Sequence, residues 1–196
     1  MYSYFDISDI VGIIIGGGEG SRMYELTETR GKLMVPLAGT LKQISPTINN
    51  MNHSKINRLY ILTQYQPVSF NNYLKQHWNG WGNGEDKNLE ALQAFKSRQE
   101  RDDWFEGSAD ALRMSAQYWN KSHPSLVVLA SVDHLYNMDY RAMLMFAKET
   151  NADFVLSATK IPFEDGKDKG VLEVEKSGSK ILKIHENAAF SNSLTI

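Results

Sequence analysis

The sequence predicts an α/β fold in which helices cover a layered sheet. Short runs rich in Val, Ile and Leu are typical of strands that are buried on both faces. Segments with apolar residues at three- and four-residue spacing lie between these runs, and such spacing is typical of helices. Because strands and helices alternate, a layered α/β architecture is expected. The expected strands are residues 10–15, 58–63, 126–130 and 153–159.

Three helices are expected between these strands, at residues 67–77, 108–119 and 139–149. Pro67 suits a first helical turn because its missing N–H has no partner there. Ser108 and Asp139 are predicted to cap the second and third helices through their side-chain oxygens. Near the end of the chain, "GVLEVEKSGSKILKI" alternates apolar and polar residues around a turn, which predicts a hairpin.

Aromatic residues are divided between core and surface in this interpretation. The Gly/Asn-rich segment "HWNGWGNGEDKN" is predicted to be a loop that exposes Trp78 and Trp81. Those two side chains would then be available for surface or subunit contacts. Four other aromatic side chains are spaced as core residues and are expected to pack inside; they are Phe105, Trp119, Phe146 and Phe154.

Composition excludes several classes of function. A chain of 196 residues can bury a full core, and its net charge of −2 provides no basic field for nucleic acid. The absence of cysteine excludes disulfides, thiolate metal sites and thiol nucleophiles. The first residues lack the basic start of a secretory signal, and the longest apolar runs are far below the ~20 residues of a membrane helix. We therefore expect a soluble, cytoplasmic protein with neither a nucleic-acid nor a membrane partner.

The stretch "VGIIIGGGEGSR", residues 11–22, is a candidate phosphate-binding loop. Glycines after a strand allow backbone N–H groups to converge on an anion where no side chain intrudes. The spacing fits neither the Walker pattern nor the dinucleotide fingerprint, and a tight turn after a core strand remains the alternative. Arg22 and Lys32 would supply cations, or they are ordinary solvated charges.

Asp133 is the candidate metal ligand. It follows the apolar run "LVVLAS", and ligands gather at the carboxyl ends of strands in open α/β sheets. A turn or helix-cap aspartate is the alternative reading of the same residue. His134 beside it is expected to be structural.

Five segments occur in the same order as the motifs of one enzyme family. They are "GGGEGSRMYELTETRGKLMVPLAG", "INRLYILTQYQPVSFNNYL", "WFEGSADALR", "VVLASVDHLYNMDYRAML" and "KGVLEVEKSGSKILKIHEN". On these motifs nearly the whole chain resembles the ADP-glucose pyrophosphorylases (glucose-1-phosphate adenylyltransferases), within the sugar-nucleotide pyrophosphorylases. The glycine and ADA motifs are shared with sister enzymes, whereas "DHLYNMDY" together with "WFEGSADA" indicates the adenylyl branch.

The resemblance implies a Rossmann-like, three-layer nucleotidyltransferase domain with a mixed, mostly parallel sheet. Residues 1–196 would be the N-terminal part of that catalytic domain, and the family's C-terminal β-helix domain would lie outside this chain. The implied reaction joins ATP and α-D-glucose 1-phosphate into ADP-glucose and pyrophosphate, with Mg²⁺, in glycogen or starch synthesis. A homo- or hetero-oligomer is expected, since the family forms tetramers.

The resemblance also assigns roles to individual residues. Arg22 and Lys32 would be catalytic cations at the ATP phosphates, and Asp133 would be catalytic and hold the metal. Two residues, Gly170 and Glu186, would face the sugar phosphate. The residues implied for nucleotide binding are Gly17, Gly18, Gly20, Gly107, Ser108 and Asp110.

Several residues depart from the family pattern. Val132 replaces a glycine before Asp133 and is expected to add a side chain where the nucleotide approaches. Leu33 replaces a proline and is expected to loosen the segment that presents Lys32. Three further positions also differ: Lys42 stands for arginine, Ser45 for aspartate and Lys55 for glycine. Asn187 and Ala188 replace the lysine and proline of the family's EKP motif, and the loop "ALQAFKSRQE" lacks the glutamine expected to read adenine.

These departures keep two alternatives open. One is a non-catalytic regulatory subunit that retains the fold and binds nucleotide, motivated by Lys42, Val132 and Asn187. The other is a sister pyrophosphorylase that uses another nucleoside triphosphate.

Overall fold

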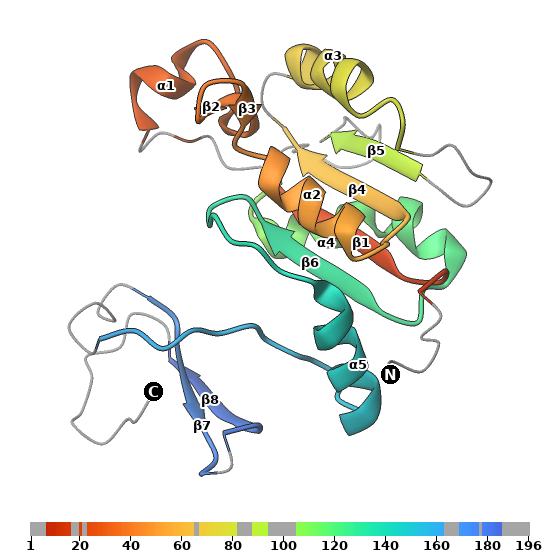
Figure 1. Ribbon diagram of the computed structural model, residues 1–196, viewed down its shortest axis with the longest axis vertical. Helices are drawn as coiled ribbons and strands as arrows, with labels where there is room; N and C mark the ends of the chain where they lie inside the picture. Colours follow the sequence, from red (N-terminus) through yellow and green to blue (C-terminus); the bar gives the residue numbers. More distant parts are fainter. Residues whose placement is uncertain are drawn as a thin grey trace. The chain divides into compact units, whose positions relative to one another are not determined.

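The computed structural model describes residues 7–16, 20, 23–64, 67–81, 88–93, 105–162, 169–176 and 178–185. The chain divides into two compact units, Met1–Asp153 and Phe154–Ile196. Figure 1 shows the ribbon, in which the larger unit holds the central sheet. No helix among these residues is long and apolar enough to cross a membrane.

The central sheet of the first unit has four parallel strands in the order β5-β4-β1-β6. Three predicted strands are confirmed within a residue or so, and β5 is one that the sequence analysis assigned partly to a loop. The register aligns Ile15 of β1 with Leu62 of β4 and Ser131 of β6, so the three carboxyl ends lie at one edge. The strands are β1 (Val11–Ile15), β4 (Arg58–Thr63), β5 (Asn88–Gln93) and β6 (Val127–Ser131).

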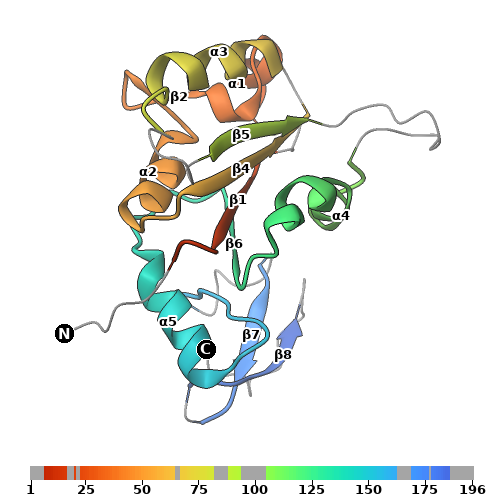
Figure 2. The same cartoon turned by 90° about the vertical axis from the view of Figure 1, so that its right-hand side faces the viewer.

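Helices cover both faces of this sheet, as Figure 2 shows for α2 and α4. On one face, side chains from α2, α3 and α5 pack against alternate residues of β1, β4 and β6. On the other face, Ala111 and Leu112 of α4 pack against the remaining alternate residues of β1 and β4. The predicted three-layer α/β architecture is therefore confirmed. The helices are α2 (Ser45–His53), α3 (Pro67–His77), α4 (Ser108–Trp119) and α5 (Tyr140–Thr150).

The helix ends agree with prediction in one case and differ in another. The Asp139 side chain accepts a hydrogen bond from the Arg141 amide, so it caps α5 as predicted. Ser108 does not cap α4, because Gly107 occupies the cap position and Ser108 is the first helical residue. Asp110 instead reaches back and accepts from the Glu106 amide at 3.2 Å. A carboxylate in the first turn is also favoured by the positive end of the helix dipole.

Short elements lie between β1 and α2, on the segment that carries Lys32. These are α1 (Glu25–Glu28), the 3₁₀ helix η2 (Lys32–Met34), and the antiparallel pair β2 (Pro36–Leu37) and β3 (Leu41–Lys42). A second 3₁₀ helix, η3 (Asn120–Ser122), follows α4. The segment from η2 to β3 closes back on itself, since the Gln43 and Ile44 amides donate to the Val35 and Leu33 carbonyls.

The second unit contains the predicted hairpin, formed by β7 (Val171–Val174) and β8 (Ile181–His185). Gly178 has a φ of +78°, a conformation that its missing Cβ makes accessible. The prediction of a strand at 153–159 was wrong. A strand needs a hydrogen-bonded neighbour, and no sheet among the described residues includes this segment.

The aromatic predictions were partly wrong. Trp78 and Trp81 are half-buried against the core, and the Trp81 indole donates to the Asn57 carbonyl at 3.1 Å. Phe146 and Phe154 are 40% and 65% exposed rather than packed inside. Phe146 lies outside the stripe of α5 that faces the sheet, which consists of Tyr140, Leu144 and Ala147.

Candidate functional site

The site lies where the strand order changes direction. From β1 the chain continues outward through β4 and β5, whereas β6 pairs on the other side of β1. Loops that leave the carboxyl ends of β1 and β6 therefore diverge, and ligands of open α/β sheets bind in the crevice at such a point. The glycine loop leaves β1 there, and Asp133 leaves β6 there.

The first glycine of the loop is a packing residue. Gly16 donates its amide to the Leu62 carbonyl at 2.9 Å, which extends the sheet by one residue. A Cβ at Gly16 would come within 2.9 Å of both Cγ and Cδ1 of Leu33. The absence of a side chain at Gly16 thus allows η2 to pack against the end of β1.

Gly20 closes the loop beside Lys32. Its φ of +75° favours glycine, and a Cβ there would lie 2.8 Å from Cγ2 of Thr27 and 3.4 Å from Cβ of Lys32. The Thr27 hydroxyl donates to the Gly20 carbonyl at 2.9 Å, and the Met23 amide donates to the same oxygen. These bonds hold the return of the loop against the segment that carries Lys32.

Lys32 and Asp133 form an ion pair between Nζ and Oδ1 across 101 positions of sequence. The Lys32 side chain is 19% exposed and that of Asp133 is 53% exposed. The Asp133 amide donates to the Ser131 hydroxyl at 3.2 Å. The structure therefore brings together Gly20, Lys32 and Asp133, three of the residues that the sequence singled out.

Two departures from the family pattern have consequences opposite to those expected. Leu33 does not loosen the Lys32 segment, because its side chain is buried in the core against Gly16. The Val132 side chain is only 1% exposed and joins the core cluster, so it does not project into the site. The Val132 carbonyl accepts a hydrogen bond from the side-chain Nε2 of Gln43 at 3.2 Å. This bond links the Lys32 segment to the backbone before Asp133.

A second group of predicted residues lies at the start of α4. Gly107 and Ser108 are exposed, and a Cβ at Gly107 would meet no atom within 4 Å. Gln64, which follows β4, accepts from the Phe105 amide at 2.9 Å. Because Gln64 stands at the carboxyl end of its strand, this bond places the start of α4 at the same edge of the sheet as Asp133.

Both carboxylate oxygens of Asp110 accept hydrogen bonds from neighbouring residues. Its Oδ1 accepts from Nε and Nη2 of Arg113 at 3.1 and 2.9 Å, and Oδ2 accepts from the Glu106 amide. The Arg113 guanidinium, with the Glu106 amide, lowers the pKa of Asp110 below its ordinary value. Asp110 thus fixes the turn that presents Gly107.

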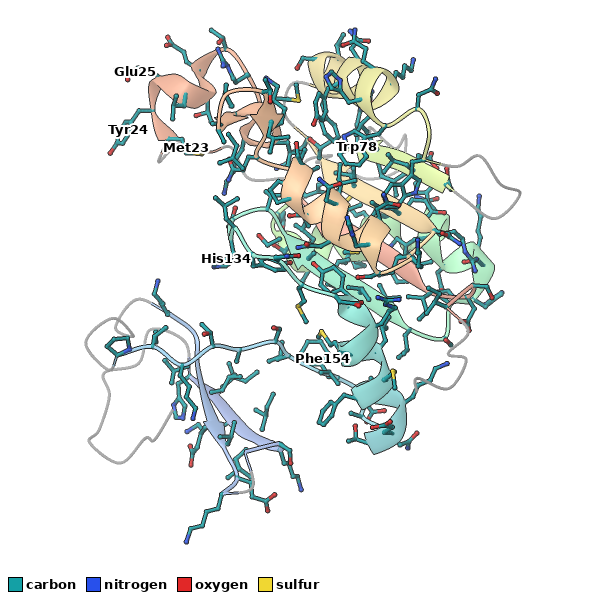
Figure 3. All side chains as sticks on the ribbon, in the orientation of Figure 1. Met23, Tyr24, Glu25, Trp78, His134 and Phe154 are labelled. Carbon is teal, nitrogen blue, oxygen red and sulfur yellow. The ribbon has the colours of Figure 1, made fainter. Side chains whose placement is uncertain are left out.

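A buried polar network holds the segment after Asp133. The Asn50 side chain donates to the Tyr136 carbonyl at 2.9 Å and accepts from the Met138 amide at 3.3 Å. The Ser54 hydroxyl accepts from the Tyr140 amide at 2.8 Å. Burial, together with the hydrogen bond to Tyr136, raises the pKa of the Tyr140 hydroxyl. His134 is exposed in the loop beyond β6 (Figure 3), and its expected structural role stays a prediction.

Asp133 suits a magnesium ion that arrives with phosphates. Among the described residues, no group of three or more His, Asp or Glu side chains could hold a metal ion by itself. Mg²⁺ typically binds one or two carboxylates and takes its remaining ligands from water and substrate phosphates. A single half-exposed carboxylate beside a candidate phosphate loop fits that donor set.

Several predicted site residues are not placed by the structure. Gly17, Gly18, Arg22 and Glu186 lie outside the described residues, as do Asn187 and the positions near 96 expected to read adenine. Gly170 is described, at the start of the hairpin in the second unit, and a Cβ there would meet no atom within 4 Å.

Sequence reasoning missed four supporting residues. Thr27 and Gln64 lie in the quoted motif segments, so their motif membership was a usable signal. Asn50 and Gln43 act through backbone groups about 90 positions away. Nothing in the local sequence indicates such long-range contacts.

Comparisons with known proteins identify the family of this chain. Residues 11–189 match the family described as "Nucleotidyl transferase". The chain is 34% identical over 175 residues to glucose-1-phosphate adenylyltransferase 1 of Vibrio vulnificus (strain YJ016), covering 89% of this chain and 42% of that protein. It is 35% identical, with the same coverage, to glucose-1-phosphate adenylyltransferase of Aliivibrio fischeri (strain MJ11). The chain thus spans less than half the length of these relatives, and by its match over most of its residues it belongs to the nucleotidyl transferase family.

Proposed function

We propose that this chain forms part of an adenylyltransferase that converts ATP and α-D-glucose 1-phosphate into ADP-glucose and pyrophosphate. The observation that carries the proposal is the convergence of Gly20, Lys32 and Asp133 at the switch point between β1 and β6. The names of the relatives indicate the substrates. Residues 1–196 would be the N-terminal part of the catalytic domain, within a larger oligomeric assembly.

The chemistry requires positioning more than acid-base catalysis. The attacking group is a phosphate oxygen of the sugar phosphate, which is already largely ionised at pH 7 because its second pKa is near 6. The barrier therefore arises from bringing two polyanions together and from charge that develops on the departing pyrophosphate. Cations aimed at that charge are the effective catalytic groups.

The residues of the site divide these tasks. The glycine loop with Arg22 and Lys32 would hold the triphosphate, and Gly107 and Ser108 would line the nucleotide. Gly170 and Glu186 would face the sugar phosphate. Asp133 would hold Mg²⁺, which supplies positive charge at the phosphates when bound. Asp110 would act indirectly, since it fixes the turn before α4.

The test is pyrophosphate release from the 196-residue chain with ATP, glucose 1-phosphate and Mg²⁺. Asp133→Asn should abolish release because it removes the metal carboxylate. Asp9→Asn is the matched control, since Asp9 precedes β1 and lies at the opposite end of that strand. Equal activity in the wild type and Asp133→Asn would refute the proposed role of this carboxylate.

A panel of nucleoside triphosphates and sugar 1-phosphates addresses the sister-enzyme alternative. Release of pyrophosphate with another pair, and none with ATP and glucose 1-phosphate, would identify a sister pyrophosphorylase. Nucleotide binding without turnover, even beside a longer relative, would identify the regulatory alternative. The burial of Val132 removes one of the three observations that motivated that alternative.

A further inference from the structure

Lys32 and Asp133 neutralise each other as an ion pair. The ammonium Nζ contacts Oδ1 of the carboxylate that the proposed function assigns to the metal. An ammonium and a divalent cation are both drawn to a carboxylate by its negative charge, and they repel each other at close range. The two cations therefore compete for Asp133.

The backbone of Lys32 is fixed, whereas its ammonium is held by one half-exposed carboxylate. Leu33 is buried, its carbonyl accepts from the Ile44 amide, and the stem of Lys32 lies against Gly20. The far end of the side chain reaches a carboxylate that is more than half exposed. A pair whose carboxylate is open to water is held less tightly than a fully buried pair, so an incoming charge can replace either partner.

The position of Lys32 would bring an anion bound in the glycine loop within reach of its ammonium. Its Cβ lies 3.4 Å from the point where a side chain of Gly20 would begin, so the lysine leaves the backbone beside the candidate phosphate loop. A triphosphate in that loop would offer the ammonium several negative oxygens in place of one. The carboxylate would then be available to a divalent cation.

We propose that Lys32 is an exchangeable cation for Asp133, which makes binding of a divalent cation and of a nucleoside triphosphate cooperative. Without nucleotide, the tethered ammonium holds the carboxylate and weakens binding of the free metal ion. With nucleotide, the ammonium moves to the phosphates, and the metal ion binds Asp133 and the phosphates together. The inference rests on the proposed function for the identity of the anion, but the competition at Asp133 does not.

The competition predicts that removing Lys32 tightens metal binding in the absence of nucleotide. For Lys32→Met, we expect the Kd of Mn²⁺ to fall about 10-fold, which corresponds to about 1.4 kcal/mol. We expect the factor by which a non-hydrolysable ATP analogue tightens Mn²⁺ binding to fall by a similar amount. Thermodynamic linkage requires the analogue and the metal ion to show the same factor in either order of addition.

The measurement is free Mn²⁺ by electron paramagnetic resonance, titrated into the 196-residue chain with and without the analogue. Lys32→Met is compared with the wild type and with Lys121→Met, which removes the same charge from η3, ahead of β6. The double variant Lys32→Met/Asp133→Asn locates the effect. It should lose the tighter binding if the gain occurs at Asp133.

Three results would overturn the inference: equal Mn²⁺ affinity in the wild type and Lys32→Met, a gain that persists in the double variant, or an equal gain in Lys121→Met. Lys32→Gln, which keeps a polar side chain, replaces Lys32→Met if circular dichroism shows that the latter does not fold. Failure of the analogue to bind would count against the proposed function alone. The nucleotide-free comparison would still decide the competition at Asp133.

Discussion

Lys55 occupies a backbone position that suits glycine. It follows the C-cap of α2 with a φ of +61°, in the left-handed region. The Ile56 amide donates to the Met51 carbonyl at 3.1 Å and the Lys55 amide to the Asn52 carbonyl at 3.0 Å, which is the Schellman pattern. The resembled family has glycine here, so Lys55→Gly should stabilise this chain.

The size of the effect follows from two opposing contributions. A side chain in the left-handed region costs roughly 1–2 kcal/mol because Cβ crowds the following carbonyl. Glycine also has greater conformational freedom in the unfolded chain, and this offsets roughly 0.5–1 kcal/mol of the stabilisation. Lys55 is exposed, so little packing is lost. The expected increase in the free energy of unfolding is about 0.5–1 kcal/mol, or about 2 °C in Tm for a chain of this size.

The assay is urea unfolding followed by circular dichroism, with thermal melts for comparison. The matched control is Lys75→Gly in the last turn of α3, which makes the same chemical change at a helical position. That control should lower the free energy of unfolding, by up to about 1 kcal/mol, because glycine is a poor helix former. A decrease for Lys55→Gly, or shifts of the same sign in the two variants, would refute the reasoning.

Three other expectations concern the site and its supports. Gly20→Ala should weaken ATP binding about 10-fold or more by calorimetry, because its φ of +75° and the Thr27 methyl 2.8 Å away force the loop to move; unchanged affinity would show that this loop does not contact the nucleotide. Asn50→Ala removes two hydrogen bonds to the segment 136–138, so it should lower the free energy of unfolding by about 2–3 kcal/mol in urea titrations. The control is Asn52→Ala, at an exposed position of α2. Arg113→Met should raise the pKa of Asp110 toward its ordinary value, since the guanidinium is the first cause of its lowering. Because the folded-state pKa is lowered, the wild-type pair contributes to stability above the unfolded pKa, and that contribution is lost as the pH falls through the folded pKa. A carboxyl NMR titration that finds the same Asp110 pKa in both proteins would contradict this assignment.

The sheet and its helices were predictable because their signals are local. The runs that became β1 and β4 are apolar on both faces, as strands covered on both sides must be. The run that became β6 is equally apolar, although this strand lies at the other edge of the sheet and its Leu129 is 44% exposed. Strand β5 reads "NLEALQ", and its mixed composition reflects its place at the edge of the sheet. The segment 153–159 was predicted to be a strand and is not one, because an apolar run forms a strand only where a neighbouring strand offers hydrogen bonds.

The sequence predicted that Lys32 and Asp133 belong to one site, but it did not predict the residues that support them. Motif order brought Lys32 and Asp133 into one hypothesis, and the structure joins them by an ion pair. The direction of the Val132 side chain depends on which face of β6 meets α2 and α5, and a comparison of motifs contains no such information. The contact from Gln43 to the Val132 carbonyl likewise depends on the path of the segment between η2 and α2.

The contact between Gly16 and Leu33 links the sizes of two residues that are 17 positions apart. The volume that a side chain at position 16 would need is filled by the leucine, so a substitution there is sterically possible only if position 33 becomes smaller. In related sequences, a residue larger than glycine at position 16 should therefore occur only together with a residue smaller than leucine at position 33. A double variant with a larger residue at position 16 and a smaller one at position 33 should restore a fold that either substitution alone disrupts.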